Sequence, residues 1–150
     1  MIKKWKDSKD KKCLVVQGAR QTGKTYTTDL SLLISMKDFS IKQHIVENTL
    51  SGNTKGGIYE CAVADAFYKR GYSLYFYKNE SSKKEIDMLI QKNGSVVPVE
   101  VKSGNARAAS LISFMEKKTY IEYGYKFIDG NIGVSGSRII TLPLYMAAFL

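Results

Sequence analysis

Hydrophobic and polar residues alternate most regularly over residues 85–102, on both sides of Asn93-Gly94. A two-residue alternation is typical of a strand with one buried face, and an Asn-Gly pair between two such runs favours a tight hairpin turn. Counting outward from this turn fixes the register of the two strands. The apolar pairs in that register are Ile90 with Val97, Met88 with Val99 and Ile86 with Val101. We therefore predict a β-hairpin with these six side chains on one apolar face.

The rest of the chain predicts an alternation of further strands and helices. Runs rich in β-branched and aromatic residues predict strands at 13–17, 73–78, 123–128 and 138–142. Apolar stripes predict helices at 28–36, 58–70 and 106–118, with Thr28 or Asp29 as the first N-cap and Gly71 closing the second helix. Residues 37–55 are mixed and polar, and we expect a loop at 51–57. The predicted fold class is α/β, a mixed sheet flanked by helices.

The other face of the predicted hairpin carries two opposed acids. Asp87 and Glu100 fall in a non-hydrogen-bonded pair, in which Cβ atoms lie roughly 4.5–5.5 Å apart. Like charges in this position destabilise a sheet, so a shared proton or a cation is expected to offset the repulsion. Lys102 projects from the same face, because it lies two residues beyond Glu100. Two carboxylates and an ammonium suit Mg²⁺, with the lysine near an attacking water or a phosphate. The alternatives are an ordinary solvated polar face, or a β-bulge that separates the acids.

A glycine-rich segment follows the first predicted strand. Residues 18–25 read Gly-Ala-Arg-Gln-Thr-Gly-Lys-Thr, which is the P-loop pattern. In that pattern the backbone around Gly18 and Gly23 holds a phosphate, Lys24 reaches the β/γ-phosphates and Thr25 binds Mg²⁺. A P-loop ATPase also needs an acidic residue at the end of a second apolar strand. We find no convincing candidate, so we expect no ATP hydrolysis and keep ATP binding as an alternative.

Composition and charge narrow the partners. The chain has 150 residues, of which 44% are hydrophobic and 25% charged, as expected for one globular domain. No apolar run approaches the roughly 20 residues of a membrane span, and no secretion signal is evident, so we predict a cytoplasmic protein without a membrane partner. Most of the net charge of +9 lies in residues 1–25, which hold eight Lys/Arg and two Asp. This basic arm makes nucleic acid a candidate partner, with a solvated tail as the alternative.

Several phrases resemble a family of prokaryotic AAA-type ATPases. Residues 16–25 resemble the start of its ATPase domain. Four further segments resemble its uncharacterised C-terminal domain: Lys55-Gly-Gly-Ile-Tyr-Glu60, Glu85-Ile-Asp-Met-Leu-Ile90, Val97-Pro-Val-Glu-Val-Lys-Ser103 and Thr141-Leu-Pro-Leu-Tyr145. The element order also resembles the restriction-endonuclease-like PD-(D/E)XK nuclease core. This resemblance implies that Asp87 and Glu100 bind Mg²⁺ with Glu60 in support, and that Lys102 orients water or stabilises the pentavalent phosphate. Glu60 has an alternative role, since a negative charge suits the first turn of its helix.

The middle of the chain departs from that family. Most of an ATPase domain is missing between Thr25 and Thr28, and an internal deletion is the simplest account. We therefore divide the chain into a P-loop ATPase fragment at 1–26, a helical linker at 27–55 and a nuclease-like domain at 56–150. The predicted function is a nuclease-like domain that binds a divalent metal and nucleic acid, with phosphodiester hydrolysis left open. The alternatives are an inactive remnant that serves as a nucleic-acid or protein interaction module, and nucleotide binding through the P-loop.

Overall fold

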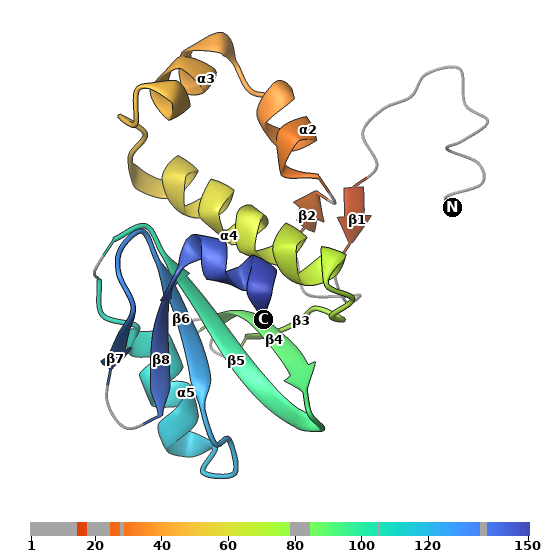
Figure 1. Cartoon of the computed structure of the whole chain (residues 1–150), viewed down its shortest axis with the longest axis vertical. Coiled ribbons are helices and arrows are strands. Elements are labelled where there is room, and N and C mark those ends of the chain that lie inside the picture. The colour runs from red at the N-terminus through yellow and green to blue at the C-terminus, as the bar shows by residue number, and fades with distance from the viewer. Residues whose placement is uncertain (1–14, 18–24, 28, 79–84, 105, 136–137) are drawn as a thin grey trace, which may run out of the picture.

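A computed structural model of the chain describes residues 15–17, 25–27, 29–78, 85–104, 106–135 and 138–150. Its main feature is a six-stranded sheet with helical segments on both faces (Figure 1). The strands of this sheet are β3 (Tyr75–Lys78), β4 (Glu85–Lys92), β5 (Ser95–Lys102), β6 (Gly124–Ile128), β7 (Gly133–Ser135) and β8 (Ile139–Pro143). The helical segments are α2 (Leu30–Ser35), α3 (Phe39–Val46), α4 (Gly52–Lys69), α5 (Ala109–Lys117) and the 3₁₀ helix η1 (Leu144–Phe149). The prediction of an α/β fold with a mixed sheet is confirmed.

The sheet is mixed, and its strands lie in the order β3-β4-β5-β6-β8-β7. The neighbours β5, β6 and β8 are parallel to one another, whereas β3, β4 and β7 pair antiparallel with theirs. Parallel strands need a crossover connection, which α5 supplies between β5 and β6. As a result, Lys102, Ile128 and Pro143 lie in one row at the edge where the three parallel strands end.

Two hydrophobic clusters hold the helices on opposite faces of the sheet. On one face, Val63, Ala64 and Phe67 of α4 pack with inward side chains of β4, β5 and β6 and with η1. On the other face, Leu111, Phe114 and Met115 of α5 pack against Ile139 and neighbouring residues. Adjacent residues of a strand point to opposite faces, so Ile139 and Ile140 fall in different clusters. The molecule therefore has three layers, with the sheet between α4 and α5.

The predicted hairpin forms, with β4 and β5 joined by Asn93-Gly94, both of which have positive φ as the tight turn requires. The predicted register holds over five pairs, from Lys92–Ser95 to Met88–Val99. Beyond Met88 the prediction of a single apolar face is wrong. Ile86 packs in the α5 cluster, although Met88 and Ile90 pack under α4.

The cause is a β-bulge in β4. Tyr75 pairs with Leu89 but Tyr77 pairs with Ile86, so two steps along β3 correspond to three along β4. The extra residue lies between Ile86 and Leu89, where Asp87 and Met88 stand. A bulge adds a residue without a partner and turns the following side chain to the other face. Ile86 is turned toward α5 in this way.

The helix boundaries are partly as predicted. Asp29 caps α2, since its Oδ1 accepts a hydrogen bond from the Leu32 N–H at 3.0 Å, and Gly71, with φ of 86°, follows the C-cap of α4. The loop expected at 51–57 is wrong, because α4 begins at Gly52, and α3 lies within the predicted helical linker at 27–55, where its own bounds were not predicted. Glycines lower helix propensity by about 1 kcal/mol each, but tertiary packing of the later turns overrides such a local preference.

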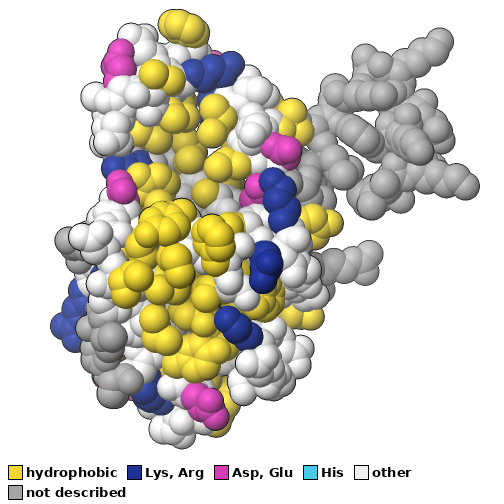
Figure 2. Space-filling model, viewed as in Figure 1, with side chains coloured by type: hydrophobic (Ala, Val, Ile, Leu, Met, Phe, Trp, Pro, Cys, Tyr) yellow, Lys and Arg dark blue, Asp and Glu magenta, His cyan; other side chains and the backbone are white. Residues whose placement is uncertain are grey.

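The helices α2 and α3 form an arm on the side of α4 away from the sheet (Figure 1). Neither helix buries a residue, and large side chains such as Phe39 and Val46 are mostly exposed. Hydrophobic side chains also gather over α4, η1 and the adjoining strands on the face shown in Figure 2. The arm therefore contributes little to the core, in contrast to α4.

Among the described residues, no helix is long and apolar enough to cross a membrane.

Candidate functional site

Glu100 is the centre of the candidate site, in the middle layer of the fold. It lies on β5 with only 2% of its surface exposed, a burial that an ionised carboxylate tolerates only with strong partners. Its Oε2 accepts a hydrogen bond from the Leu111 N–H at 2.7 Å, in the first turn of α5. The N-cap of α5 is Ala108, which has no side-chain acceptor. Glu100 thus replaces the missing cap, and the positive end of the helix dipole stabilises its charge.

Lys102 supplies the counter-charge to Glu100. Its Nζ lies 2.6 Å from Oε1 of Glu100, and it projects from the same face two residues further along β5. The lysine side chain is 31% exposed, so this ion pair opens toward solvent on the lysine side only. The predicted neighbourhood of Glu100 and Lys102 is confirmed by this contact. Their roles in metal or phosphate chemistry stay predictions.

Asp87 stands on the bulge of β4, beside the peptide that joins Glu100 to Val101. Its Oδ2 accepts a hydrogen bond from the Val101 N–H at 2.8 Å. In the regular hairpin this N–H would meet a backbone carbonyl of β4, but the β4–β5 ladder ends at Met88–Val99. The Asp87 carboxylate takes the place of that carbonyl. The two acids are therefore not a regular cross-strand pair, although the Asp87 carboxylate binds the residue next to Glu100.

Glu60 approaches from a different layer. It lies in the first half of α4, which covers the sheet face opposite to α5, and it is partly buried. Within the described ranges, no three Asp, Glu, His or Cys residues are grouped so that they could hold a metal ion. The structure thus brings Asp87, Glu100 and Lys102 to one end of the hairpin, and it does not join Glu60 to them as a three-acid site.

Lys126 is a charged residue beside the site that the sequence reasoning missed. The parallel register sets Lys126 of β6 between Glu100 of β5 and Thr141 of β8, and its residue surface is only 6% exposed. Tyr125 and Phe127 on either side face the α4 cluster, so Lys126 points to the α5 side. A lysine between two aromatic residues in the strand predicted at 123–128 was the signal available. Glu100 therefore has two lysines as neighbours, one bonded to it and one on the next strand.

A second polar group anchors the start of α4 to the end of β6. The Tyr59 hydroxyl donates to Oδ2 of Asp129 at 2.8 Å, and the Lys55 Nζ lies 3.3 Å from the same oxygen. The Tyr59 hydrogen bond, followed by the hydrogen bond from Lys55, lowers the pKa of Asp129 below its usual value. The reciprocal hydrogen bond to Asp129 raises the pKa of Lys55. The segment Lys55–Glu60, which resembles part of a family domain, therefore also has a structural role: it attaches α4 to the residue that follows β6.

The predicted nucleotide site lies mostly outside the described residues. Gly18, Gly23 and Lys24 are not described, and of Thr25 only the backbone is. The short strands β1 (Val15–Gln17) and β2 (Thr25–Thr27) pair antiparallel, with Gln17 opposite Thr25. A working P-loop leads from a strand directly into a helix. Here the residues that follow the motif form a strand instead, and nucleotide binding stays a prediction.

The fold and the site together define a three-layer α/β domain with a polar cluster at the root of a bulged hairpin. The family described as Domain of unknown function (DUF4143) matches residues 55–146, which is more than half of the chain. The chain belongs to this family, whose domain occurs in AAA-ATPase-associated proteins. No curated protein and no solved structure matches the chain significantly. The resemblance to AAA-type ATPases that carry such a domain is therefore supported at the level of the C-terminal domain.

Proposed function

We propose that this domain is nuclease-like and acts on nucleic acid with a divalent metal ion held near Asp87 and Glu100. The observation that carries the proposal is the contact of Glu100 with Lys102 at 2.6 Å, beside the bulge that carries Asp87. The order α4, β3, β4–β5 hairpin, α5, β6 is also the order expected of a PD-(D/E)XK core. That second argument is a fold-level analogy, and the function depends on the site.

The donor chemistry at the site fits Mg²⁺. Asp87 and Glu100 offer hard carboxylate oxygens, and Mg²⁺ is commonly held by one or two carboxylates while it keeps several waters. Each acid uses one oxygen for a backbone N–H, so the protein already fixes the orientation of both carboxylates. A group of three acids is not required for this mode of binding. The proposed ligands are therefore Asp87 and Glu100, without the support of Glu60 that the resemblance implied.

Lys102 and Glu100 would have different roles in phosphodiester hydrolysis. A bound divalent ion supplies polarisation of the phosphate and a lower pKa for the attacking water. Water adds to phosphorus, the bond to one ester oxygen breaks, and the water proton passes to solvent or to the leaving oxygen. Lys102 is partly exposed, so it can turn from Glu100 toward a phosphate and stabilise the added negative charge. Glu100 keeps its bond to the α5 amide during that movement.

Cleavage of supercoiled plasmid and of single-stranded DNA with Mg²⁺ or Mn²⁺ tests the proposal. We expect Asp87→Asn, Glu100→Gln and Lys102→Met each to reduce the cleavage rate by at least 100-fold. Lys69→Met is the matched control, because it removes a lysine that forms an ion pair of 2.7 Å with Asp65 on α4, away from the site. Equal rates in the control and in the three site variants would reject catalysis at this site.

The second candidate is a protein interaction module without catalytic activity. It is favoured by α2 and α3, whose apolar side chains are not buried within the described chain. Large exposed apolar surfaces commonly mark sites of protein association. Calorimetric metal binding without cleavage of any DNA or RNA substrate would select this function over the first.

A further inference from the structure

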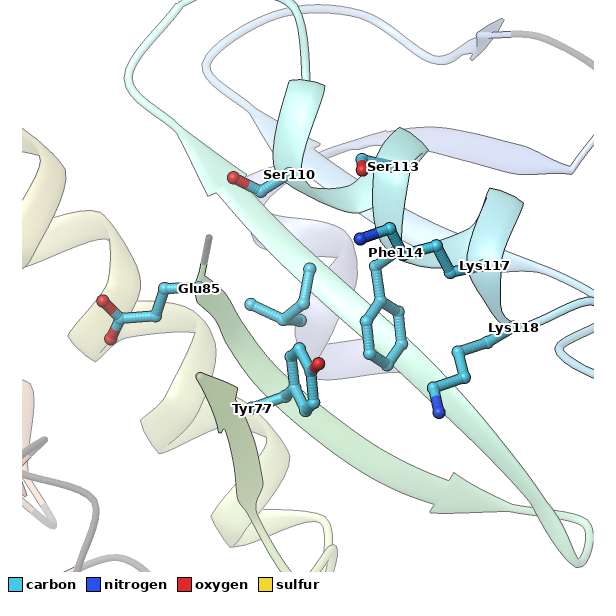
Figure 3. A pocket seen from close by; sticks show the side chains of 8 residues that line it. Tyr77, Glu85, Ser110, Ser113, Phe114, Lys117 and Lys118 are labelled. Carbon is cyan, nitrogen blue, oxygen red and sulfur yellow. The ribbon is translucent and has the colours of Figure 1, made fainter. Parts of the chain in front are cut away.

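We infer that the cleft between α5 and the β3–β4 edge binds an unpaired nucleoside next to the phosphodiester that reaches Asp87 and Glu100. This inference rests on the proposed function and narrows its substrate class to single-stranded nucleic acid. The cleft is formed by Tyr77 of β3, Glu85 and Ile86 of β4, and one side of α5 (Figure 3). None of the proposed catalytic residues, Asp87, Glu100 and Lys102, lines this cleft.

Two residues of the cleft are chain neighbours of the candidate site. Ile86, in its floor, directly precedes Asp87, and the bulge is what turns Ile86 toward α5. Ser110, in its wall, directly precedes Leu111, whose N–H holds Glu100. A chain lying in the cleft would thus reach both proposed metal ligands. The same bulge that positions Asp87 also shapes this neighbouring surface.

The floor of the cleft is aromatic. The rings of Tyr77 and Phe114 have centroids 4.8 Å apart and are tilted by 54° (Figure 3). The cleft holds only about 30 Å³ of water-accessible space, and Phe114 is itself buried, so a ligand must lie across the cleft and contact mainly the half-buried Tyr77 ring. A flat base fits this requirement. Bases stacked within a duplex do not expose their faces, so an aromatic platform of this kind selects unpaired ones.

The wall of the cleft is polar and becomes positive toward the end of α5. Ser110, Ser113 and Lys117 follow one another at helical spacing, with Lys118 adjacent. Ser110 and Lys117 are seven residues apart, or about 10 Å along the helix axis. Hydroxyl groups at one end and two ammonium groups at the other suit a base or sugar followed by phosphates. The one acid of the lining, Glu85, points away from the two rings (Figure 3).

The charge pattern favours nucleic acid over an acidic peptide. Phosphates and carboxylates would both meet Lys117 and Lys118, but only a base would use the adjoining ring surface. Stacking of one base on an aromatic side chain contributes about 1–3 kcal/mol, or about 5- to 150-fold in affinity. The aromatic contribution therefore separates the two kinds of ligand, and a poly-glutamate peptide is the competitor that tests it.

The experiment measures binding of fluorescent oligo-dT of ten nucleotides to the full chain in EDTA, where metal-dependent cleavage is absent. We expect tighter binding of this strand than of a ten-base-pair duplex. Tyr77→Leu should weaken single-strand binding at least 5-fold, whereas Tyr77→Phe, which keeps the ring, should change it less than 2-fold. Thermal melting of both variants shows whether each is folded.

The lysines are tested by charge-matched double variants. Lys117→Ala/Lys118→Ala should weaken binding about 10-fold. The slope of log affinity against log salt concentration should fall by about one to two, because fewer counterions are released. Lys37→Ala/Lys42→Ala removes the same charge from the α2–α3 region and should change affinity less than 2-fold. Equal loss in the two double variants, equal affinity for duplex, or full displacement by poly-glutamate would overturn the inference. Binding as expected without cleavage in Mg²⁺ would reject the proposed hydrolysis and leave the cleft assignment standing.

Discussion

The two faces of the central sheet differ in what their side chains do. Under α4 and η1, the strands contribute an uninterrupted set of apolar residues, from Met88 and Val99 to Phe127 and Leu142. Under α5, the same strands also carry Glu100, Lys102 and Lys126, surrounded by a smaller apolar cluster. One face is organised for burial. The other accepts the cost of buried charge and satisfies it with a helix terminus and a lysine.

The bulge in β4 changes which side chains of the strand point to each face of the sheet. Without it, Ile86 would lie beside Met88 in the α4 cluster, and the Val101 N–H would bond a backbone carbonyl. With it, Ile86 joins the α5 cluster and the Asp87 carboxylate accepts from Val101. Bulges often lie next to functional sites because they redirect side chains. The comparison teaches that the charged face is built by a local irregularity, not by the alternation alone.

The largest effect is expected on the apolar face. Phe67 of α4 is fully buried and contacts the rings of Tyr72 and Phe127 at 5.4 and 5.8 Å. Phe67→Ala should lower the free energy of unfolding by about 3–5 kcal/mol, because it removes apolar burial and leaves a cavity. Chemical denaturation measures the loss. The adjacent Tyr68→Ala, at a position 53% exposed, is the control and should cost less than about 1 kcal/mol. Similar losses in both would show that burial of Phe67 against the sheet does not set the cost of the substitution.

The ion pair on the charged face should respond asymmetrically. In Lys102→Met the buried Glu100 carboxylate keeps its hydrogen bond from the Leu111 N–H but loses its ion pair. This variant should cost about 2–4 kcal/mol of stability. Glu100→Gln keeps an acceptor for Leu111, and the released lysine can turn to water, so about 1–2 kcal/mol is expected. Urea denaturation of the two variants compares them. A larger loss for Glu100→Gln would contradict this picture of a one-sided, solvent-open pair.

The close approach of α5 to the sheet gives a third effect. A Cβ on Gly124 would lie 3.1 Å from the Met115 sulfur and also 3.1 Å from the Pro98 Cγ and carbonyl oxygen. Gly124→Ala should therefore destabilise the fold by about 1–3 kcal/mol through overpacking. Gly133→Ala in β7 is the matched control, since its nearest contact would be a Thr141 carbon at 4.0 Å. Thermal denaturation should show little change for the control, and equal shifts would mean that backbone preference, not crowding, decides the outcome.

Much of the fold follows from local pattern. Asn93-Gly94 specifies its turn, the flanking alternation specifies five cross-strand pairs, and Asp29 specifies the start of α2. The extension of α4 across Gly56 and Gly57 could not be predicted, because packing of its later turns outweighs the local propensity of glycine. For α3 the reason is different, because its apolar residues carry no clear helical period and none of them is buried. The start of α4 is therefore a boundary that tertiary packing sets and that pattern alone misses.

The sequence predicted which residues gather at the candidate site better than it predicted how they contact one another. Glu100 and Lys102 share a strand, and a spacing of two suffices to set them on one face. The bulge at Asp87 has no sequence signature here, since neither Gly nor Pro marks it. The contact between Glu100 and Leu111 and the neighbourhood of Lys126 depend on a crossover helix and a parallel strand, which join residues distant in sequence. Such contacts require the folded chain.

The smallest effect concerns the contact of α4 with Asp129, the residue that follows the C-terminal end of β6. Hydrogen bonds from the Tyr59 hydroxyl and then from Lys55 lower the pKa of Asp129, so the folded state favours its ionised form. The stabilisation is therefore present above the unfolded value near 3.8 and is lost as the pH falls through the lower, folded value. Because Asp129 is half exposed, solvent screening keeps the gain below about 1 kcal/mol. Asp129→Asn should be slightly less stable than the parent at pH 7 and equal to it near pH 2, as measured by urea denaturation at each pH. Glu116→Gln, at an exposed acid of α5, is the control, and an Asp129→Asn deficit that grows on acidification would show that the anchor does not act through the charge of Asp129.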